Sequence, residues 1–494
     1  MTAHPRELDA QDGTRVAAHE PVTGVDLPPS AAERAPIYSD LVRAHTVTGL
    51  VGLLLAATFG LIVATKFSAP EFMGDSAVTS WGRMRFAHVQ GILYAWLMNG
   101  FVAFAYYAVP TLSGRPVLSR RLGWVIFWVW NIGVVLLGWT FVLLGYSQSV
   151  EWGEFPVVVD IVTLVGFLAL GVQFLAPYLR KPRGRLYVSS WYTTLALTFS
   201  PAAFVIGQFF PEYLTPGALG AVLSGLWIHD AVGLLVTPLT LAIAYYVIPA
   251  TTGRPIFSHF MSLVGFWSLV FFYPLNGIHH YVFSPIPMGA QKVAIMASVF
   301  VGIGVVIVVT NLLASLRGNG HLTFYDIPLR FVWTGIIFYL LVSLQGAFQA
   351  SMRVQETIHF SDWVIAHSHL AMAGFASFII IGGLLHAWPR VSGRVVHRRL
   401  ANLGYWVATL GLSTMVVYLT IVGLQQADAW MSGAPWIESV VVSKTGWVVR
   451  SFSGLFLFSA FVILIVALYK SPRPQRPTEA PTGRDDRTSV EVGR

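Results

Sequence analysis

The chain has 494 residues, of which 55% are hydrophobic and 11% charged, with a formal net charge of +8 and no cysteine. Together with a mean hydropathy of +0.65, this excludes an ordinary soluble domain and indicates a polytopic membrane protein. The lack of cysteine excludes disulfides, thiolate metal centres and cysteine-attached c-type heme in this chain.

Twelve apolar runs are long enough to cross a bilayer, which needs about 20 residues per helix. They cover roughly residues 41–65, 86–110, 122–145, 156–179, 189–210, 219–248, 257–283, 291–316, 327–350, 361–388, 400–424 and 445–469. The sequence thus predicts an all-α bundle of twelve transmembrane helices forming one domain, residues 41–470. Residues 1–40 lack a signal-peptide core, and residues 471–494 are rich in Pro, Arg and Asp. Both are predicted to be disordered cytoplasmic tails.

Basic and acidic residues divide between alternate connections of this bundle. The basic set is Arg115, Arg120, Arg121, Arg180, Lys181, Arg183, Arg185, Arg254, Arg317, Arg330, Arg390, Arg394, Arg398 and Arg399. The acidic set is Glu151, Glu154, Glu212, Glu356, Asp362, Asp428 and Glu438. Because basic loops stay in the cytoplasm, we expect an integral protein of a bacterial or archaeal cytoplasmic membrane with both termini cytoplasmic. The net positive charge is therefore a topology signal and does not indicate binding to nucleic acid.

Six histidines within the apolar runs are the most informative residues: His88, His229, His279, His280, His367 and His369. The other eight histidines lie in tails or near helix ends and are read as structural. Residues two apart on a helix point about 200° from each other, so His367 and His369 cannot serve one site. Each can instead reach a different large cofactor, which suits two hemes separated by one helix. The other four would supply the second axial ligand of one heme and three ligands of a separate metal.

Topology supports this grouping, because five of the six histidines lie toward the outer membrane face. His229 lies about ten residues into the sixth run, about 15 Å deep by helical rise, where it can meet the seventh helix. The alternative for any one of them is a structural histidine hydrogen-bonded within the bundle.

Polar side chains on the seventh and sixth helices form a second pattern. Tyr273 precedes His280 by seven residues, nearly two helical turns, so its phenol is expected on the same face and in reach of the metal. Ser262 lies on that face toward the cytoplasm, and Tyr245 ends the sixth helix. These residues suggest a polar track to the metal. The alternative is a core tyrosine bonded to a backbone carbonyl, with scattered polar residues of the kind common in bundles.

Several motifs together resemble subunit I of the heme-copper oxidases, and most closely the C family, the cbb-type cytochrome c oxidases. The resemblance covers about residues 40 to 470. The motifs are RMRFAH at 83–88, QSVEW at 148–152, the sixth-helix motif opened by His229, YPLNGIHHYVFSPIP at 273–287, and SDW at 361–363 followed by HSHL at 367–370.

The resemblance implies a role for each histidine. His88 and His369 would be the axial pair of a low-spin heme b, and His367 the proximal ligand of a high-spin heme of b type. His229, His279 and His280 would hold copper B, with Tyr273 covalently joined to His229. In the other two families the phenol comes four residues after the sixth-helix histidine, where this chain has Gly233.

Further residues match the family less specifically. The resemblance suggests Arg85 as a partner of heme propionates, Glu151 as a ligand of a bridging calcium, and Ser262 with Tyr245 in a cytoplasmic proton path. For Arg85 and Glu151 the alternative is ordinary surface charge. The sequence also departs from the family pattern at Gln345, where cbb-type enzymes carry a glutamate, and beside His88, where it reads Val-Gln-Gly.

The implied function is that of a terminal respiratory oxidase, a cytochrome c oxidase. Dioxygen would be reduced to water at the high-spin heme and copper B, with electrons passed through the low-spin heme and with coupled proton movement. Since the chain has no cysteine, the electron donor must be another chain, either a c-type cytochrome subunit or a different donor.

Two other functions remain open from the sequence. A nitric oxide reductase of the same superfamily holds non-heme iron and typically adds a glutamate one turn after the sixth-helix histidine. Here that turn offers Gly233, and Asp230 points about 100° away from His229. The His-Ser-His-Leu motif also resembles reductases, so a copper-containing nitric oxide reductase stays open. A cofactor-free secondary transporter would explain the hydropathy but neither the six histidines nor the lack of a clear inverted repeat.

Overall fold

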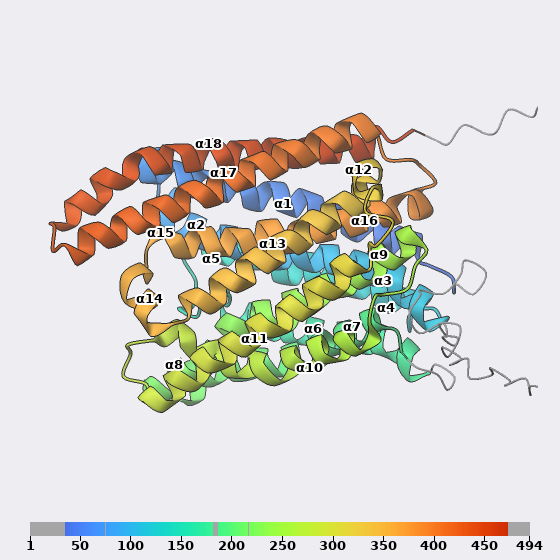
Figure 1. Cartoon of the computed structure of the whole chain (residues 1–494), viewed down its shortest axis with the longest axis horizontal. Coiled ribbons are helices and arrows are strands. Elements are labelled where there is room, and N and C mark those ends of the chain that lie inside the picture. Colours follow the sequence, from blue (N-terminus) through green and yellow to red (C-terminus); the bar gives the residue numbers. More distant parts are fainter. Residues whose placement is uncertain (1–34, 75, 181–185, 216, 473–494) are drawn as a thin grey trace, which may run out of the picture.

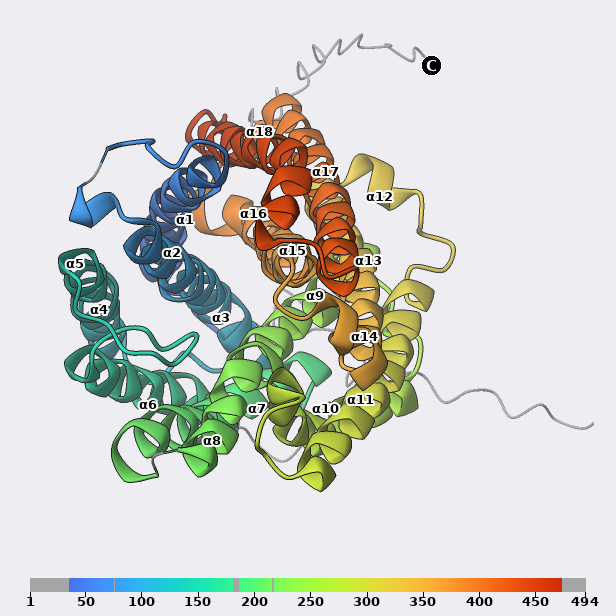
Figure 2. The same ribbon diagram turned by 90° about the vertical axis from the view of Figure 1, so that its left-hand side faces the viewer.

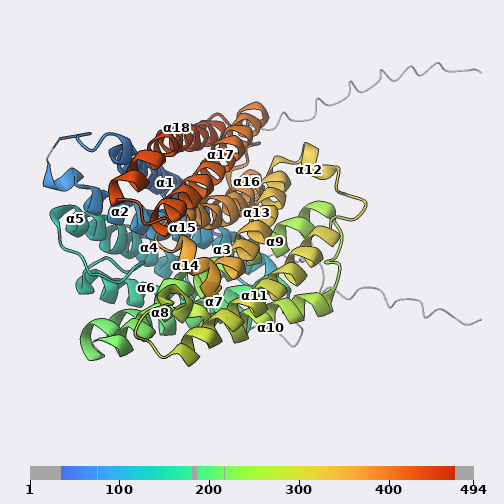
Figure 3. The same ribbon diagram turned by 60° about the vertical axis from the view of Figure 1, so that its left-hand side comes forward.

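The structure is a computed structural model that describes residues 35–472 except 75, 181–185 and 216. Within these residues it contains twelve helical spans that are long and apolar enough to cross a membrane, and no strand. The long helices run nearly parallel to one another (Figures 1 and 3). Helices suit a bilayer because each pairs its own backbone polar groups. The predicted all-α bundle of twelve membrane helices is therefore confirmed.

The first six spans include four that contain both α- and π-helical segments. In chain order the six are α1 (Ser39–Ser68); α2 (Trp81–Gln90), η3 (Gly91–Leu97) and α3 (Met98–Ser113); α4 (Arg120–Trp128), η4 (Val129–Leu136) and α5 (Leu137–Leu144); α6 (Val157–Leu179); α7 (Val188–Phe204) and η5 (Val205–Leu214); and α8 (Ala218–Asp230), η6 (Ala231–Val236) and α9 (Thr237–Thr252).

The last six spans complete the bundle. They are α10 (His259–Asn276) with the 3-10 turn η7 (Gly277–Tyr281); α11 (Met288–Ala314); α13 (Ile327–Gln349); α15 (Asp362–His369), η8 (Leu370–Ser377) and α16 (Phe378–Ser392); α17 (Arg398–Met431); and α18 (Trp436–Tyr469). The short elements η2 (Ala77–Thr79), α12 (Leu322–Tyr325) and α14 (Met352–Ile358) lie in connections.

The last two helices are longer than the apolar runs at 400–424 and 445–469. Both α17 and α18 have 34 residues, and their hairpin reaches beyond the other helices at one end (Figure 1). Hydropathy marks the part of a helix that lipid can cover. The helices themselves continue past that point, where the rings of Trp430 and Trp436 stack with centroids 5.6 Å apart.

The parts of the predicted tails at residues 1–34 and 473–494 lie outside the described residues, as do Lys181, Arg183 and Arg185 of the basic connections. The two described ends of the bundle, the start of α1 and the end of α18, lie at the same end of the molecule (Figure 1). This follows from an even number of spans.

Three spans form the centre of the bundle. In their most apolar stretches, 89%, 94% and 89% of the residues are buried in the second, sixth and tenth spans, against 33% to 56% in the others. Figure 2, which looks along the bundle, shows the chain running around this centre in sequence order. A helix that is apolar on all sides is covered on all sides. Side chains of these three spans therefore face protein and not lipid.

Each central span also changes to π-helix just after its histidine. The π-helical segments begin at Gly91, Ala231 and Leu370, within three residues of His88, His229 and His369. Such segments widen a helix locally and are frequent at functional sites. The third and fifth spans carry π-helical segments as well, so this feature alone does not mark a site.

The sixth and seventh spans touch at two glycines. A Cβ atom on Gly277 would lie 2.2 Å from the carbonyl oxygen of Gly225, which is far inside van der Waals contact. Because neither residue has a side chain, the turn η7 lies directly against α8. This contact brings the seventh span's histidines to the sixth span's histidine.

We expect Gly277→Ala to separate these two spans. The added methyl group would meet backbone atoms of Gly225 and Leu226, which cannot rotate away, so overpacking should cost about 1–3 kcal/mol and lower the melting temperature in detergent. Gly289→Ala is the matched control, because a Cβ there has no neighbour within 4 Å. Equal melting temperatures of the two variants would contradict this account of the contact.

Candidate active site

Two large cavities lie on opposite sides of the helix that carries His367 and His369. The first is lined by residues that include His367, and the second by residues that include His369. Ser368, between them, lines both cavities. Mostly apolar walls with a few convergent polar groups are typical of cofactor sites. The two-residue spacing thus directs the neighbouring histidines into separate cavities.

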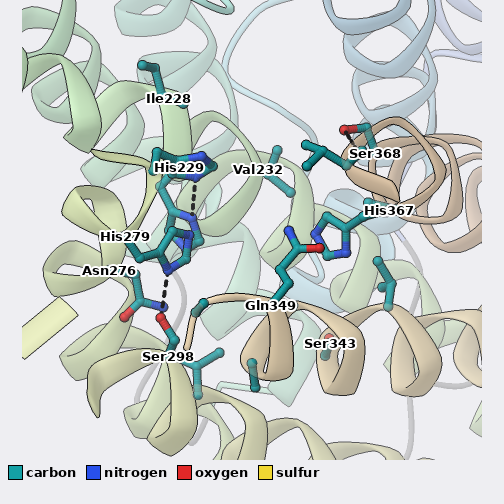
Figure 4. Close-up of a pocket in the computed structure, with 18 of the residues that line it drawn as sticks. Ile228, His229, Val232, Asn276, His279, Ser298, Ser343, Gln349, His367 and Ser368 are labelled. Atoms are coloured by element: carbon teal, nitrogen blue, oxygen red, sulfur yellow. Dashed lines mark hydrogen bonds between the residues drawn. The ribbon is translucent and has the colours of Figure 1, made fainter. Parts of the chain in front are cut away.

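Three further histidines meet in the first cavity. The ligand nitrogens of His229, His279 and His280 all lie within 4.8 Å of one another, and Nδ1 of His229 is 3.3 Å from Nε2 of His280. Nδ1 of His279 bonds to the Ser298 hydroxyl at 2.7 Å, which leaves its Nε2 free. Figure 4 shows His229 and His279 on one side of the cavity and His367 on the other. The donor set is three imidazoles facing a fourth.

Carboxylates are scarce around this cluster. Among the described residues that line the first cavity, Glu151 is the only one with a carboxylate. Asp230, next to His229, is fully buried but does not line the cavity. Three neutral imidazole nitrogens without a hard oxygen ligand suit copper better than non-heme iron, because non-heme iron also prefers oxygen ligands. The residues present therefore fit copper.

Tyr273 lines the same cavity, and its ring centroid is 5.3 Å from that of His229. A Cβ atom on Gly233 would lie 2.4 Å from Cδ1 of Tyr273, so the phenol occupies the space that a side chain at 233 would fill. The continuous α-helix assumed between Tyr273 and His280 is not present, because α10 ends at Asn276 and the next five residues form a 3-10 turn. Tyr273 and His280 nevertheless line the same cavity, with Tyr273 beside His229.

His88 and His369 face each other across the second cavity. Their ring centroids are 6.3 Å apart and their planes differ by 21°. Two imidazoles bonded to opposite sides of one metal at about 2 Å have centroids about 6 Å apart. Nδ1 of His88 bonds to the Ala56 carbonyl at 2.8 Å, and Nδ1 of His369 to the Ile365 carbonyl at 2.9 Å. Both Nε2 atoms are thus left for an iron, and the pair fits a six-coordinate heme.

The predicted charged residues lie at the outer edge of the cavities. Arg85 lines the second cavity, and its guanidinium is 3.5 Å from the Glu151 carboxylate and 3.8 Å from the Glu154 carboxylate. Glu151 lines both cavities. Within the described part of the chain, no group of three or more ligand-bearing side chains forms around Glu151.

Arg450 is a cavity residue that the sequence analysis did not single out. Its side chain is 9% exposed and lines the second cavity, and its closest carboxylate, Asp362, is 3.7 Å away. Asp362 already accepts hydrogen bonds from Trp447 at 2.7 Å and Gln426 at 2.9 Å. An arginine within an apolar run could have been flagged from sequence, since such residues are usually functional. Nη1 of Arg450 is buried and makes no hydrogen bond within the described residues, which favours an additional anion in this cavity.

Glu154 is a second residue that the motif analysis did not single out. It lies outside the spans, is 1% exposed, and accepts a hydrogen bond from the Gln90 amide. Burial raises the pKa of this carboxyl to about 7, although the nearby Arg85 opposes the shift. The group therefore changes its protonation near neutral pH. Burial could not be inferred for an acid in an outer loop.

Ser262 and Tyr245 do not line the first cavity, and both lie beside Asn311. The Asn311 amide donates to the Ser262 hydroxyl at 2.8 Å, and the Tyr245 hydroxyl lies beside both. The ring of Tyr245 stacks on Tyr192 with centroids 5.5 Å apart. Asn311 and Tyr192 come from other spans and carried no signal in the sequence. The two predicted residues are thus brought together through a third.

Comparisons with known proteins agree with this arrangement. A family profile described as cytochrome c and quinol oxidase polypeptide I matches residues 40–456. The chain is 27% identical over 455 residues to a cbb3-type cytochrome c oxidase subunit of Stutzerimonas stutzeri, covering 89% of this chain and 96% of the relative. It is 28% identical over 424 residues to cytochrome c oxidase subunit 1 of Rhodobacter capsulatus, covering 83% and 77%.

A solved structure shares the fold. A cryo-EM structure of a heme-copper terminal oxidase dimer superposes with a TM-score of 0.71 at 13% identity, covering 91% of this chain and 86% of that one. The family match spans most of the chain, and the two cavities offer histidines in the numbers that two hemes and a copper need. The chain therefore belongs to the subunit I family of the heme-copper oxidases and is a membrane-embedded oxidoreductase of respiratory electron transport.

Proposed function

We propose that this protein is the catalytic subunit of a terminal oxidase that reduces dioxygen to water. The observation that carries the proposal is the division of histidines across α15. His367 faces the cluster of three in the first cavity, whereas His369 faces His88 in the second. A high-spin heme with copper B would occupy the first cavity and a low-spin heme the second. The names of the similar proteins support the same reading.

Each group supplies a distinct chemistry when bound: the heme iron with an open position and the copper reduce oxygen together, and the heme closed by two histidines only transfers electrons. The residues of this chain would hold these groups in place. His88, His369 and His367 would each bind a heme iron through Nε2. Arg85 and Arg450 place two positive charges at the second cavity, where they would neutralise the heme's carboxylates. By resemblance, both hemes would be of b type.

Tyr273 would supply a proton and an electron from its phenol. Nε2 of His229 is buried and has no hydrogen-bond partner among the described residues, while its Nδ1 faces His280. With Nδ1 directed to the metal, Nε2 is the atom left for the covalent link to Tyr273 that the resemblance implies. The link itself is part of the proposal.

A route for protons would run from the cytoplasmic side to Tyr273. It would begin at Ser262 and Tyr245, which meet at Asn311, and continue through Tyr192 to Tyr339, which lines the first cavity with Tyr273. The hydroxyls of Tyr192, Tyr245 and Tyr339 have no protein partner among the described residues. Buried hydroxyls of this kind usually bond to water, which suits a hydrated path.

The remaining expectations concern surroundings and partners. We propose that both termini are cytoplasmic, that tails at residues 1–40 and 471–494 flank the domain at 41–470, and that a c-type cytochrome subunit or another donor delivers electrons. Glu151 would bind a calcium ion together with heme carboxylates. Its side chain, half exposed beside Arg85, is accessible to such an ion.

Nitric oxide reduction is the competing activity. The scarcity of carboxylates around the three histidines and the position of Tyr273 both favour oxygen. The decisive experiment measures metal content and turnover of the purified enzyme on oxygen and on nitric oxide. Copper with oxygen turnover supports the oxidase, and stoichiometric non-heme iron would replace it by the reductase. A preparation without a Soret band would contain no heme, which would rule out both the oxidase and the reductase and favour a transporter.

The low-spin heme is expected to depend on His88. His88→Ala removes one of two axial ligands, so the six-coordinate signal should disappear while the high-spin signal remains in the absorption and electron paramagnetic resonance spectra. An unchanged low-spin spectrum in this variant would show that the second cavity does not hold the heme in this way.

The copper is expected to depend on the cluster of three imidazoles. His280→Ala should reduce copper to well below one equivalent, because two nitrogens bind it far less tightly than three, and both hemes should remain. Metal analysis by mass spectrometry with the heme spectrum as control checks this. Full copper occupancy in the variant would refute the assignment.

Tyr273→Phe separates a catalytic phenol from a structural one. Removing a structural hydroxyl should cost about 0.5–1.5 kcal/mol of stability, whereas removing a catalytic one should stop oxygen turnover with hemes and copper still bound. Peptide mass mapping gives an independent check, since a cross-link keeps the peptides of His229 and Tyr273 together. Separate peptides and near-normal turnover would eliminate Tyr273 from the mechanism.

A further inference from the structure

The helix α13 packs against the back of the His367 ring. Oε1 of Gln345 lies 3.3 Å from Nδ1 of His367. Gln345 is not a cavity residue, but its neighbour Gly346 is. The glutamine therefore touches the histidine on the side away from the space that the cofactor would fill.

Gly346 leaves space beside the Cε1–Nε2 edge of the His367 ring. A Cβ atom on this residue would lie 3.0 Å from Cε1 and 3.6 Å from Nε2 of His367, so a side chain here would crowd the nitrogen meant for iron. If Nε2 binds iron, the proton of the neutral imidazole is on Nδ1. The Nδ1–H group then donates to the amide oxygen of Gln345.

This hydrogen bond differs from those of the other proposed heme ligands. His88 and His369 each donate to a main-chain carbonyl. A substitution cannot replace that acceptor, because every residue has the same carbonyl group. Only His367 among the three uses a side chain as its acceptor. The acceptor is neutral, and no ion pair or hydrogen bond joins a carboxylate to this ring within the described residues.

We propose that Gln345 is a positioning residue that orients the His367 imidazole and, as a neutral acceptor, keeps the midpoint potential of the iron bound there high. The inference rests on the proposed function, since it assumes a heme on His367. A carboxylate acceptor would draw the Nδ1 proton toward itself and make the imidazole more anionic. A more anionic ligand stabilises ferric over ferrous iron, which lowers the potential.

The test compares Gln345→Glu with the parent enzyme by two measurements. Potentiometric titration should show a lower midpoint potential for the high-spin heme, and resonance Raman spectra of the ferrous enzyme should show a higher iron–histidine stretching frequency. Gln345→Leu, which removes the acceptor, should lower that frequency and broaden its band because the ring loses its orientation.

Gln349→Glu is the matched control, because it adds the same charge one turn further along α13. The Gln349 amide oxygen accepts from Trp363 Nε1 at 3.1 Å, and its side chain lies near His367 (Figure 4). A charge that acts only through space should shift the potential in both variants and leave the stretching frequency unchanged. A frequency shift confined to position 345 supports transmission through the hydrogen bond.

The outcomes separate this inference from the proposed function. If the parent enzyme has a high-spin heme that His367→Ala abolishes, the part of the proposed function on which this inference rests is present. Unchanged frequency and potential in Gln345→Glu would then overturn the role of Gln345 alone. If the parent enzyme has no such heme, the proposed function fails first. The low-spin heme serves as an internal control, since its ligands bond to main-chain carbonyls.

Discussion

The structure depends on one short helix that presents two histidines to opposite sides. The 200° between residues two apart in α15 turns it into a wall between two cavities, with one ligand on each face. Any rotation of this helix would withdraw both ligands together. Its first residue, Asp362, is held by Gln426 on α17 and Trp447 on α18, so the last two spans fix the orientation on which both sites rely.

The same wall explains how the two sites would communicate. Groups held by His367 and His369 would be separated by the width of one helix, which is a short distance for electron transfer. The first cavity contains the three-histidine cluster and Tyr273. The second contains the facing pair His88 and His369 together with two arginines. Under the proposed function, chemistry and electron delivery would take place on opposite faces of α15.

Close packing at glycines sets the geometry around this wall. Tyr273 fills the place of a side chain at Gly233, and the turn with His279 and His280 lies against Gly225. Lipid provides no hydrophobic driving force for helices to associate, so their association depends on close packing. Small residues allow helices to approach closely enough for such packing. The absence of side chains at Gly233 and Gly225 therefore makes room for the ring of Tyr273 and for the turn that carries His279 and His280.

The twelve spans and the grouping of histidines could be predicted from the chain alone, because apolar run length and helical period are local properties. The two-residue spacing of His367 and His369 is by itself enough to require separate sites. The resemblance placed Tyr273 next to His229, but only the tertiary structure showed that the phenol fills the space left by Gly233 and that the helix carrying it ends at Asn276. It also revealed the contacts of Asn311 and the bond to Gln345, because contacts between distant spans depend on packing that no local pattern encodes.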